Sequence, residues 1–323
     1  MMRKLSRVVL FLALSLALTA PGFSQGNEDR DWKSIQDQKD QKKKAEQLQD
    51  FIKKYPASSK RPGADADLVD QWAKNNEAAK ILPFAEEYKK NPPSPDATAK
   101  TKIYSQAMLV AAGMQGQAAK AAEFGEAAID ADPNHFQSLY FMAAAGLPNP
   151  EKAYQYAEKA LSIPKPPTIA QDAYNKNMVR LHGIVALPLF AQRKFSDARD
   201  HLEAVLKIDP KNQEAQYRHG FANVNLMGEA AKAAGDANLA MLRAVSESKA
   251  AEIESNKNKQ EAAQREALEL RDAAIDSLAK ALALAGPYTD QAKPLFDSLY
   301  QNKNRSMDGA DQFIASKKAE LGL

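Results

Sequence analysis

Prolines at a fixed interval divide the chain into helical stretches. Pro56, Pro133, Pro210 and Pro287 each follow the previous one by 77 residues. Proline cannot donate a backbone hydrogen bond to the preceding turn, and it disfavours helical geometry in the residue before it, so each of these prolines predicts a helix end. The recurrence predicts that the chain repeats a helical unit along its length.

The residues that precede these prolines share one helical face. A small side chain stands twelve positions before the proline at Ala121 and Ala198, and an apolar pair begins five positions before it at Ala128 and Val205. Positions twelve, eight, five and four before a residue lie on one side of a helix, so we expect them to pack against a neighbouring helix. The expected packing residues are Ala121, Ala128, Ala198, Leu202, Ala274 and Ala281.

The composition favours helices throughout. Ala, Lys, Glu, Gln, Leu and Asp are abundant, and alanine and straight-chain side chains lose little conformational entropy in a helix. β-branched residues, which favour strands, are sparse after the first ten positions. With 44% apolar and 26% charged residues, the 323-residue chain has the profile of a folded protein.

Two segments resemble the second helix of a tetratricopeptide repeat, in which a small residue opens the helix and a proline follows its end. Residues 195–212 contain Ala198 near the start and Asp209-Pro210 at the end, and residues 116–134 match in the same way. The resemblance implies 34-residue helix–turn–helix units that stack into a right-handed superhelix. We therefore expect an all-α fold: an α-solenoid of tetratricopeptide-like repeats with extra long C-terminal helices. An unrelated helical bundle is the alternative.

Four regions follow one another along the chain. They are a signal peptide at residues 1–24, an N-terminal helical region at 25–100, the repeat core at 101–222, and long helices followed by capping helices at 223–323. The first half of the last region has no proline and is rich in Ala, Glu, Lys and Gln, which predicts long helices. Residues 246–264 are strongly polar, and we expect them to form an exposed helical hairpin or a turn near Ser255–Asn258.

One stripe in this last region recurs every four positions: Ala231, Gly235 and Leu239. Such spacing permits a second helix to approach closely, and we expect that helix to belong to the same chain; a membrane dimer motif is the alternative. Hydrophobic heptads are not sustained, which disfavours a long dimeric coiled coil.

The N-terminus has the features of a signal peptide. Basic residues are followed by thirteen largely apolar residues from Val8 to Ala20, a run that spans ~20 Å as a helix and is too short for the ~30 Å hydrocarbon core of a membrane. Small side chains at Gly22 and Ser24 predict cleavage after Ser24. The mature chain, beginning at Gln25, is then periplasmic or secreted; the alternative is a retained membrane anchor.

The leader also carries the net charge of the chain. The whole sequence has 44 Lys and Arg against 41 Asp and Glu, and three of the basic residues, Arg3, Lys4 and Arg7, lie in the leader. The mature chain is therefore expected to have no net charge, which gives it no general attraction for nucleic acid or anionic lipid.

Motifs for catalysis or metal binding do not stand out. The chain has no cysteine, which excludes disulfides, thiolate metal sites and a cysteine nucleophile. Its histidines, His135, His182, His201 and His219, lack the spacing of a metal motif, and no glycine-rich phosphate loop is present. We predict no catalytic, cofactor-binding or metal-binding residues, and an enzyme is disfavoured.

The tetratricopeptide resemblance implies a protein-binding module whose first helices line a concave groove. In that family, positions two, five and nine of the first helix face the groove; the residues at five and nine, Gly183 among them, are mostly apolar here. Lys, Arg and Asn are largely absent from these positions here, so we expect an apolar or amphipathic ligand. In the alternative, the C-terminal helices fold back and bury the rings of Tyr217 and Phe221. The groove candidates are Gln106, Val110, Tyr140, Ala144, Leu187, Tyr217 and Phe221.

Together these features predict a non-catalytic adaptor or scaffold that binds a protein or peptide of unknown identity, without a transmembrane segment in the mature chain. A structural accessory of cell-envelope or outer-membrane assembly is the alternative, because residues 51–56, Phe-Ile-Lys-Lys-Tyr-Pro, are similar to second helices of repeat proteins in that process.

Overall fold

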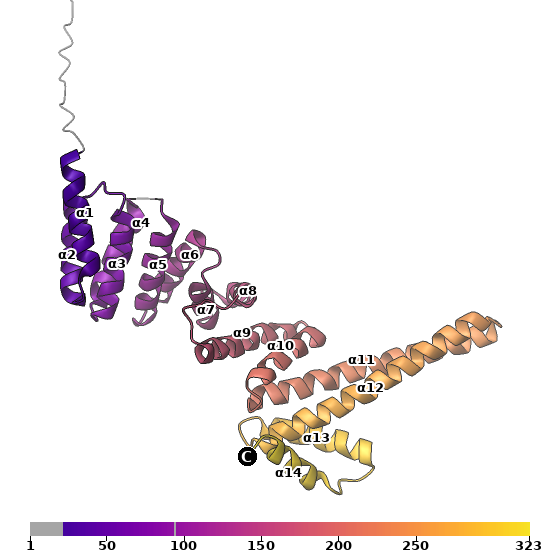
Figure 1. Ribbon diagram of the computed structural model, residues 1–323. Coiled ribbons are helices and arrows are strands. Elements are labelled where there is room, and N and C mark those ends of the chain that lie inside the picture. Colours follow the sequence, from indigo (N-terminus) through magenta and orange to yellow (C-terminus); the bar gives the residue numbers. More distant parts are fainter. Residues whose placement is uncertain (1–21, 94) are drawn as a thin grey trace, which may run out of the picture. The chain divides into compact units, whose positions relative to one another are not determined.

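The structure of the protein is a computed structural model that describes residues 22–93 and 95–323. All regular secondary structure in these residues is helical, which confirms the all-α prediction (Figure 1). The predicted signal peptide, residues 1–24, lies almost entirely outside the described residues. The described chain divides into two compact units, residues 22–110 and 111–323.

The first unit consists of successive helices joined by short turns. Asp40 caps the second of them by accepting a hydrogen bond from the backbone N–H of Lys43 at 3.0 Å, which satisfies one of the unpaired donors at a helix start. The helices are α1 (Gly22–Asp37), α2 (Gln41–Lys54), α3 (Arg61–Lys74), the 3-10 turn η1 (Ala78–Lys80), α4 (Ile81–Lys90) and α5 (Ala97–Ala112), whose last two residues belong to the second unit.

Aromatic rings link these helices. The ring of Phe51 on α2 lies 5.2 Å from that of Trp32 on α1 and 5.0 Å from that of Tyr55. Further along, the rings of Tyr88 on α4 and Tyr104 on α5 meet edge to face at 6.1 Å. Such pairs add to the hydrophobic burial of the rings. The sequence from Phe51 to Pro56 that suggested an envelope-assembly protein is therefore part of the packing of this unit.

The second unit contains the remaining helices, again mostly in contact with their neighbours in sequence. Asn149 and Asn212 cap two of them, each accepting from a backbone N–H at 3.0 Å. The helices are α6 (Ala118–Ala131), α7 (Phe136–Ala144), α8 (Pro150–Leu161), α9 (Gln171–Ala191), α10 (Phe195–Ile208), α11 (Gln213–Ser246), α12 (Ala250–Ala283), α13 (Thr289–Asn304) and α14 (Ala310–Glu320).

Helix ends and buried positions follow the proline pattern. The ends of α2, α6 and α10 each lie two residues before a proline of the 77-residue series, and α12 ends shortly before the fourth. Neighbouring helices approach closely where these helices carry small side chains. The six expected packing residues are buried, none more than 3% exposed: Ala121, Ala128, Ala198, Leu202, Ala274 and Ala281.

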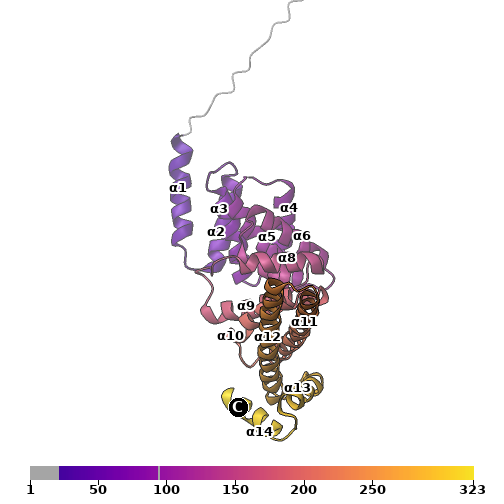
Figure 2. The ribbon, with the colours of Figure 1, turned by 90° about the vertical axis from the view of Figure 1, so that its right-hand side faces the viewer.

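The C-terminal part of this unit is dominated by a hairpin of two 34-residue helices, α11 and α12. Both views show the two helices side by side (Figures 1 and 2). The turn between them comes at Glu247–Lys249, where Ser248 has a φ of 56° and Lys249 donates to the carbonyl of Ala244 at 3.0 Å. The expected turn at Ser255–Asn258 was wrong. Those polar residues lack glycine and proline, so they continue α12.

The contact between α11 and α12 follows a seam of small residues. On α11 the less exposed residues alternate in steps of three and four, and many of them are alanines. The same spacing runs along α12 from Ile253 to Ala274. This is coiled-coil spacing within one chain, which a search for apolar heptads overlooks because alanine, asparagine and glutamine occupy the seam. The seam of α11 is Gly220, Asn223, Met227, Ala230, Ala234, Ala237, Met241 and Ala244.

The small-residue stripe expected to make this contact points elsewhere. Ala231 and Gly235 are exposed, and Leu239 is 56% exposed. Ala231 and Gly235 each directly follow a seam residue, and Leu239 lies two positions from the nearest ones. One position on a helix turns a side chain through more than a quarter of a circle. The expectation that this stripe packs within the chain was therefore wrong by about one residue of register.

Gly220 is the seam position with least space. A Cβ atom there would lie 2.7 Å from Cγ of the buried Leu278. We expect Gly220→Ala to destabilise the protein by ~1–2 kcal/mol, because overpacking outweighs the better helix propensity of alanine. Chemical unfolding followed by circular dichroism measures this change.

The matched control is Gly235→Ala on the same helix, where nothing lies within 4 Å of an added Cβ. It is expected to stabilise the helix by up to ~1 kcal/mol. Equal effects of the two substitutions would contradict the seam described above.

Candidate functional site

The groove candidates are distributed over four helices. In the first unit, Gln106 and Val110 lie half-buried on α5. In the second unit, the ring of Tyr140 on α7 stacks on that of Phe136 at 6.3 Å. Ala144, at the end of α7, accepts a hydrogen bond at its carbonyl from Arg180 on α9, at 2.7 Å.

The aromatic candidates on α11 take part in packing inside the second unit. The ring of Tyr217 stacks on that of Tyr288, just before α13, at 5.3 Å. The ring of Phe221 lies 6.1 Å from that of Phe190 on α9. Both rings are half-buried, and their aromatic neighbours belong to the chain itself. The C-terminal segment contacts the ring of Tyr217 through Tyr288, whereas the partner of Phe221 is Phe190 on α9.

Leu187, the remaining candidate, borders an open cleft along α9. Two adjoining hollows of about 270 and 450 Å³ share Val179 in their lining. The residues that α9 contributes recur at intervals of three and four, so they form one face of the helix. They are Asp172, Asn175, Lys176, Val179, Arg180, Gly183, Ile184, Ala186 and Leu187.

The opposite wall comes from α10 and the start of α11. Leu202 and Val205 of α10 form an apolar floor, and both are buried. Ile208, at the end of α10, is 37% exposed, and Leu187 is 45% exposed. Between these side chains, Gly183 leaves the cleft open, since nothing lies within 4 Å of where its Cβ would be. The cleft can therefore receive an apolar side chain from outside.

Charged groups line the rim in equal numbers. The acidic ones are Asp172, Asp209 and Glu214, and the basic ones are Lys176, Arg180 and Arg218. Arg218 Nε donates to Glu214 Oε1 at 2.8 Å, and its guanidinium lies 5.9 Å from the ring centre of Tyr288. These contacts hold Arg218 and Glu214 in place. Because acidic and basic groups are equal in number, the rim has no net charge.

This rim was missed in the sequence-based prediction. Although position two also faces the groove in the repeats that the chain resembles, and carries Arg180 and Glu214 here, candidates were named only at positions five and nine of each first helix. Those positions are poor in Lys, Arg and Asn, but the cleft also includes residues one helical turn away on α9 and the first turns of α11. The expectation that such side chains are largely absent from the binding surface therefore does not hold for this cleft. Testing every residue on the face of α9 would have found Asn175, Lys176 and Arg180.

Histidines lie behind the cleft, where helices contact each other. His182 on α9 and His201 on α10 approach to 2.9 Å between their Nδ1 atoms, so one ring donates and the other accepts. Burial, together with the neighbouring His201, lowers the pKa of His182 to about 4. Burial also lowers the pKa of His201, although Glu158 and two nearby aspartates oppose this. Nineteen residues separate the pair in sequence, so spacing alone does not reveal it.

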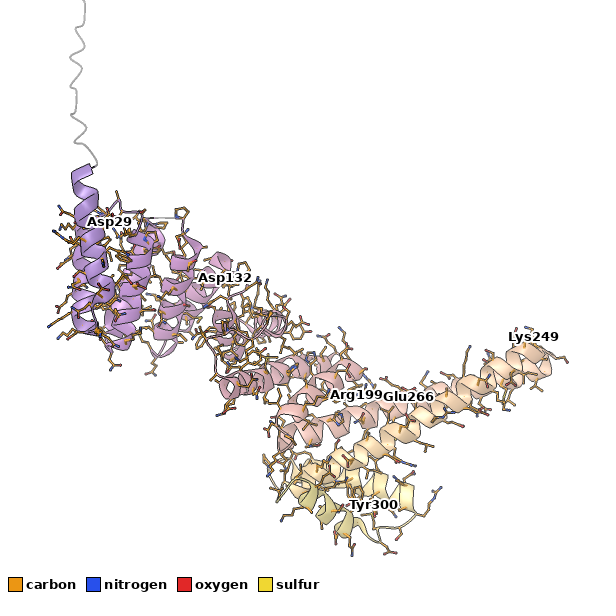
Figure 3. The ribbon with its side chains drawn as sticks, viewed as in Figure 1. Asp29, Asp132, Arg199, Lys249, Glu266 and Tyr300 are labelled. Atoms are coloured by element: carbon orange, nitrogen blue, oxygen red, sulfur yellow. The ribbon has the colours of Figure 1, made fainter. Side chains whose placement is uncertain are left out.

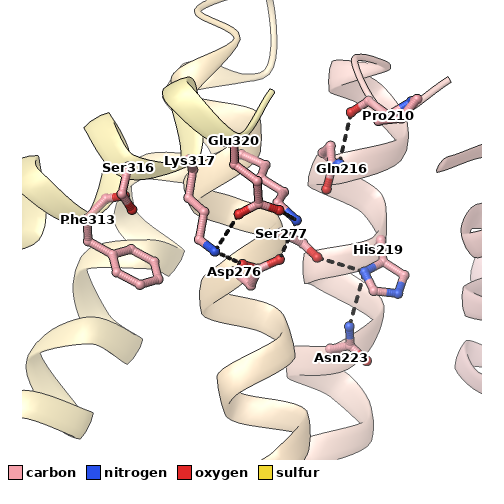
Figure 4. Close-up of polar contacts among 11 residues, drawn as sticks. Pro210, Gln216, His219, Asn223, Asp276, Ser277, Phe313, Ser316, Lys317 and Glu320 are labelled. Atoms are coloured by element: carbon pink, nitrogen blue, oxygen red, sulfur yellow. Dashed lines mark hydrogen bonds and ion pairs between the residues drawn. The ribbon is translucent and has the colours of Figure 1, made fainter. Parts of the chain in front are cut away.

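A second polar cluster joins α10, α11 and α12, and Figure 4 shows its contacts between α11 and α12. His219 Nδ1 lies 2.8 Å from Ser277 Oγ and 3.3 Å from Asn223 Nδ2. On its other side, His219 Nε2 is 3.5 Å from the carboxylate of Glu203 on α10. Burial lowers the pKa of His219, and the contact with Glu203 opposes that effect. The cluster therefore fastens the long hairpin to the helix that forms the floor of the cleft.

Metal sites and membrane-spanning helices are the two remaining features to consider. Within residues 22–93 and 95–323, no group of three or more His, Asp or Glu side chains is placed to hold a metal ion. Among the helices of the same residues, none has the length and apolar character needed to cross a membrane.

The chain matches no protein-family model and no curated protein sequence. Solved structures do match. A tetratricopeptide repeat protein from Parabacteroides merdae ATCC 43184 is 17% identical, with a TM-score of 0.40, over 86% of this chain and 100% of its own. YrrB, a TPR protein with an unusual peptide-binding site, is 16% identical, with a TM-score of 0.41, over 72% and 93%. MamA is 12% identical, with a TM-score of 0.37, over 69% and 94%.

The histidine pair generates a prediction about acid stability. Unfolded histidine takes up a proton near pH 6.5, whereas folded His182 does so only near 4. Between these values the unfolded chain binds more protons, so stability falls as the pH falls from 6.5 towards 4. The double variant His182→Gln with His201→Gln keeps a hydrogen-bonded pair that does not titrate.

Urea midpoints at pH 7 and pH 5 test this expectation. The midpoint of the unchanged protein should drop more between the two values than that of the double variant. Equal drops would show that the pair contributes nothing to the pH dependence.

Proposed function

We propose that this chain is an exported, non-catalytic adaptor that holds an amphipathic segment of another protein in the cleft along α9. The observation that carries the proposal is the cleft itself: an apolar floor at Leu202 and Val205, an open position at Gly183, and the exposed side chain of Leu187. Apolar surface that is exposed beside a preformed hollow is typical of a binding site.

The dimensions of the cleft favour a short segment. The face of α9 from Asp172 to Leu187 spans fifteen steps along the helix, which is ~22 Å at 1.5 Å per residue. A ligand of that length is a helix of about four turns, or an extended segment of about six or seven residues. Its apolar side chains would occupy the floor, and its polar groups would face the balanced charges of the rim.

The groups that carry chemistry elsewhere in proteins serve structural contacts here. His182 and His201 bond to each other, and His219 bonds to Ser277. Arg180 and Arg218 are held by a backbone carbonyl and by a carboxylate of the same chain. Such internal bonds suit a rigid scaffold that presents a shaped surface to a partner.

Filling the cleft should weaken partner binding without lowering the stability of the fold. We expect Gly183→Gln to weaken partner binding about tenfold or more, an effect of ~1.4 kcal/mol, because the new side chain occupies the open position. Helix propensity should keep the melting temperature unchanged or raise it. A photo-crosslinking amino acid at position 187 identifies the partner, and its yield with and without Gly183→Gln measures the effect.

Gly63→Gln on α3 is the matched control, since it too is a helical glycine with nothing within 4 Å of an added Cβ. It should leave crosslinking unchanged. Undiminished crosslinking in Gly183→Gln would reject the cleft as the binding site. A partner from outer-membrane assembly would instead favour the role of an envelope-assembly accessory.

The export part of the proposal depends on the leader. Its short apolar run and the small residues Gly22 and Ser24 are those of a signal peptidase substrate. Mass spectrometry of the protein from an envelope fraction should find a chain that begins near Gln25. Recovery of an intact Met1 or Met2 start in the membranes would contradict cleavage.

A further inference from the structure

The outer half of α11 exposes large apolar side chains. Leu239, Leu242 and Val245 are 56%, 55% and 53% exposed. The hairpin extends beyond the other helices of the second unit, with Lys249 at its tip and Tyr300 near its other end (Figures 1 and 3). Three such side chains within seven residues form an unusual apolar surface for a helix whose seam already packs on α12.

Both of these leucines belong to an uncharged stripe along α11. Gly228, Ala231, Gly235, Leu239 and Leu242 recur at intervals of three and four, so they lie on one face of α11. All five are exposed, and nothing lies within 4 Å of a Cβ added at either glycine. The stripe is therefore open to close approach by another helix. This surface is called the α11 stripe below.

The α11 stripe is complementary to itself. Gly235 is its centre: Ala231 and Leu239 lie four residues to either side, and Gly228 and Leu242 lie seven. Small residues therefore occupy one half and leucines the other. When a second copy runs antiparallel with Gly235 on Gly235, each Leu242 fits over Gly228 and each Leu239 over Ala231. Such an isologous contact is how two-fold dimers form.

The charges beside the stripe agree with the same register. The charged residues of this part of α11, Glu229, Lys232, Asp236 and Arg243, all lie along one side of the stripe. When two α11 helices pair antiparallel about a two-fold axis, this charged side of one helix lies next to the same side of the other. Glu229 then comes opposite Arg243, and Lys232 opposite Asp236, each within two residues of direct alignment. Lys232 and Asp236 also pair within one helix at 2.9 Å, so both are already oriented along this side.

We propose that a second copy of this chain docks on the α11 stripe, antiparallel, with the two-fold axis at Gly235. The contact is one helix face of ~21 Å, fourteen steps of 1.5 Å from Gly228 to Leu242. A single face of this length buries less area than a permanent dimer interface usually does. The dimer is therefore in equilibrium with the monomer. Two hairpins joined in this way carry two α9 clefts in one assembly.

Single cysteines test the register, because the chain has none of its own. Protein from cells that express the full chain with Gly235→Cys should form a disulfide-linked dimer under mild oxidation, since the two Gly235 positions meet at the axis. Gly228→Cys is the matched control. Its two copies would be separated by ~21 Å, far beyond the ~4–7 Å that a disulfide spans between Cα atoms.

Mixing Gly228→Cys with Leu242→Cys should restore crosslinking, now between unlike chains. Non-reducing gels read out every case. Crosslinking of Gly228→Cys as fast as Gly235→Cys would mean random collision and would overturn the proposal, as would the absence of crosslinking from Gly235→Cys.

Charge exchange provides a second measurement that does not use cysteine. Lys232→Asp alone should shift sedimentation equilibrium towards monomer, because it places like charges opposite each other. Adding Asp236→Lys should restore the dimer. Far-UV circular dichroism should show the same helix content in all variants. The interface would be rejected if the wild-type protein were monomeric at all concentrations. It would also be rejected if neither substitution altered the monomer–dimer equilibrium.

Discussion

Close approach of helices at small side chains is the interaction on which the rest of this structure depends. Ala121, Ala198 and Ala274 have no exposed surface, and each allows a neighbouring helix to come near enough to bury the larger apolar side chains around it. Gly220 takes this to its limit, because even a methyl group would meet Leu278. Close packing makes such positions intolerant of added volume. The shape of the α9 cleft follows, since its floor on α10 is held in place by these contacts.

Polar contacts then hold the long hairpin in register. His219, Asn223 and Ser277 bond across α11 and α12, and Lys317 of α14 contacts Asp276 and Glu320 (Figure 4). Hydrogen bonds from Lys280 and Lys317 lower the pKa of Glu320 to about 2. An alanine seam is smooth and determines register weakly, whereas paired polar groups bond well in only one alignment. The start of α11, which forms a wall of the cleft, is positioned by this alignment.

The sequence predicts the helix ends well because proline acts locally. A proline follows each of α2, α6 and α10, and it ends the helix independently of tertiary contacts. The buried alanines follow from helical periodicity. The cleft and the hairpin contact were harder to predict. Arg180 and Lys176 belong to the cleft only because the start of α11 and the end of α10 lie opposite them. The seam through Ala230 and Ala234 differs by one residue from the stripe through Ala231 and Gly235, and alanine and glycine stand on both faces. Hydrophobicity alone cannot choose between two such faces.

Contacts between sequence neighbours have a consequence for how the chain reaches its folded state. Most helices of each unit touch only the helix before and the helix after, so bringing them together closes short loops at little entropic cost. Proteins with such low contact order fold fast, and a stack of repeats can begin at any pair and grow outward. Within the second unit, the exceptions are α7, which also contacts α9, and α14, which returns to α12 across α13. The contact of α14 with α12 therefore completes the packing around the base of the hairpin.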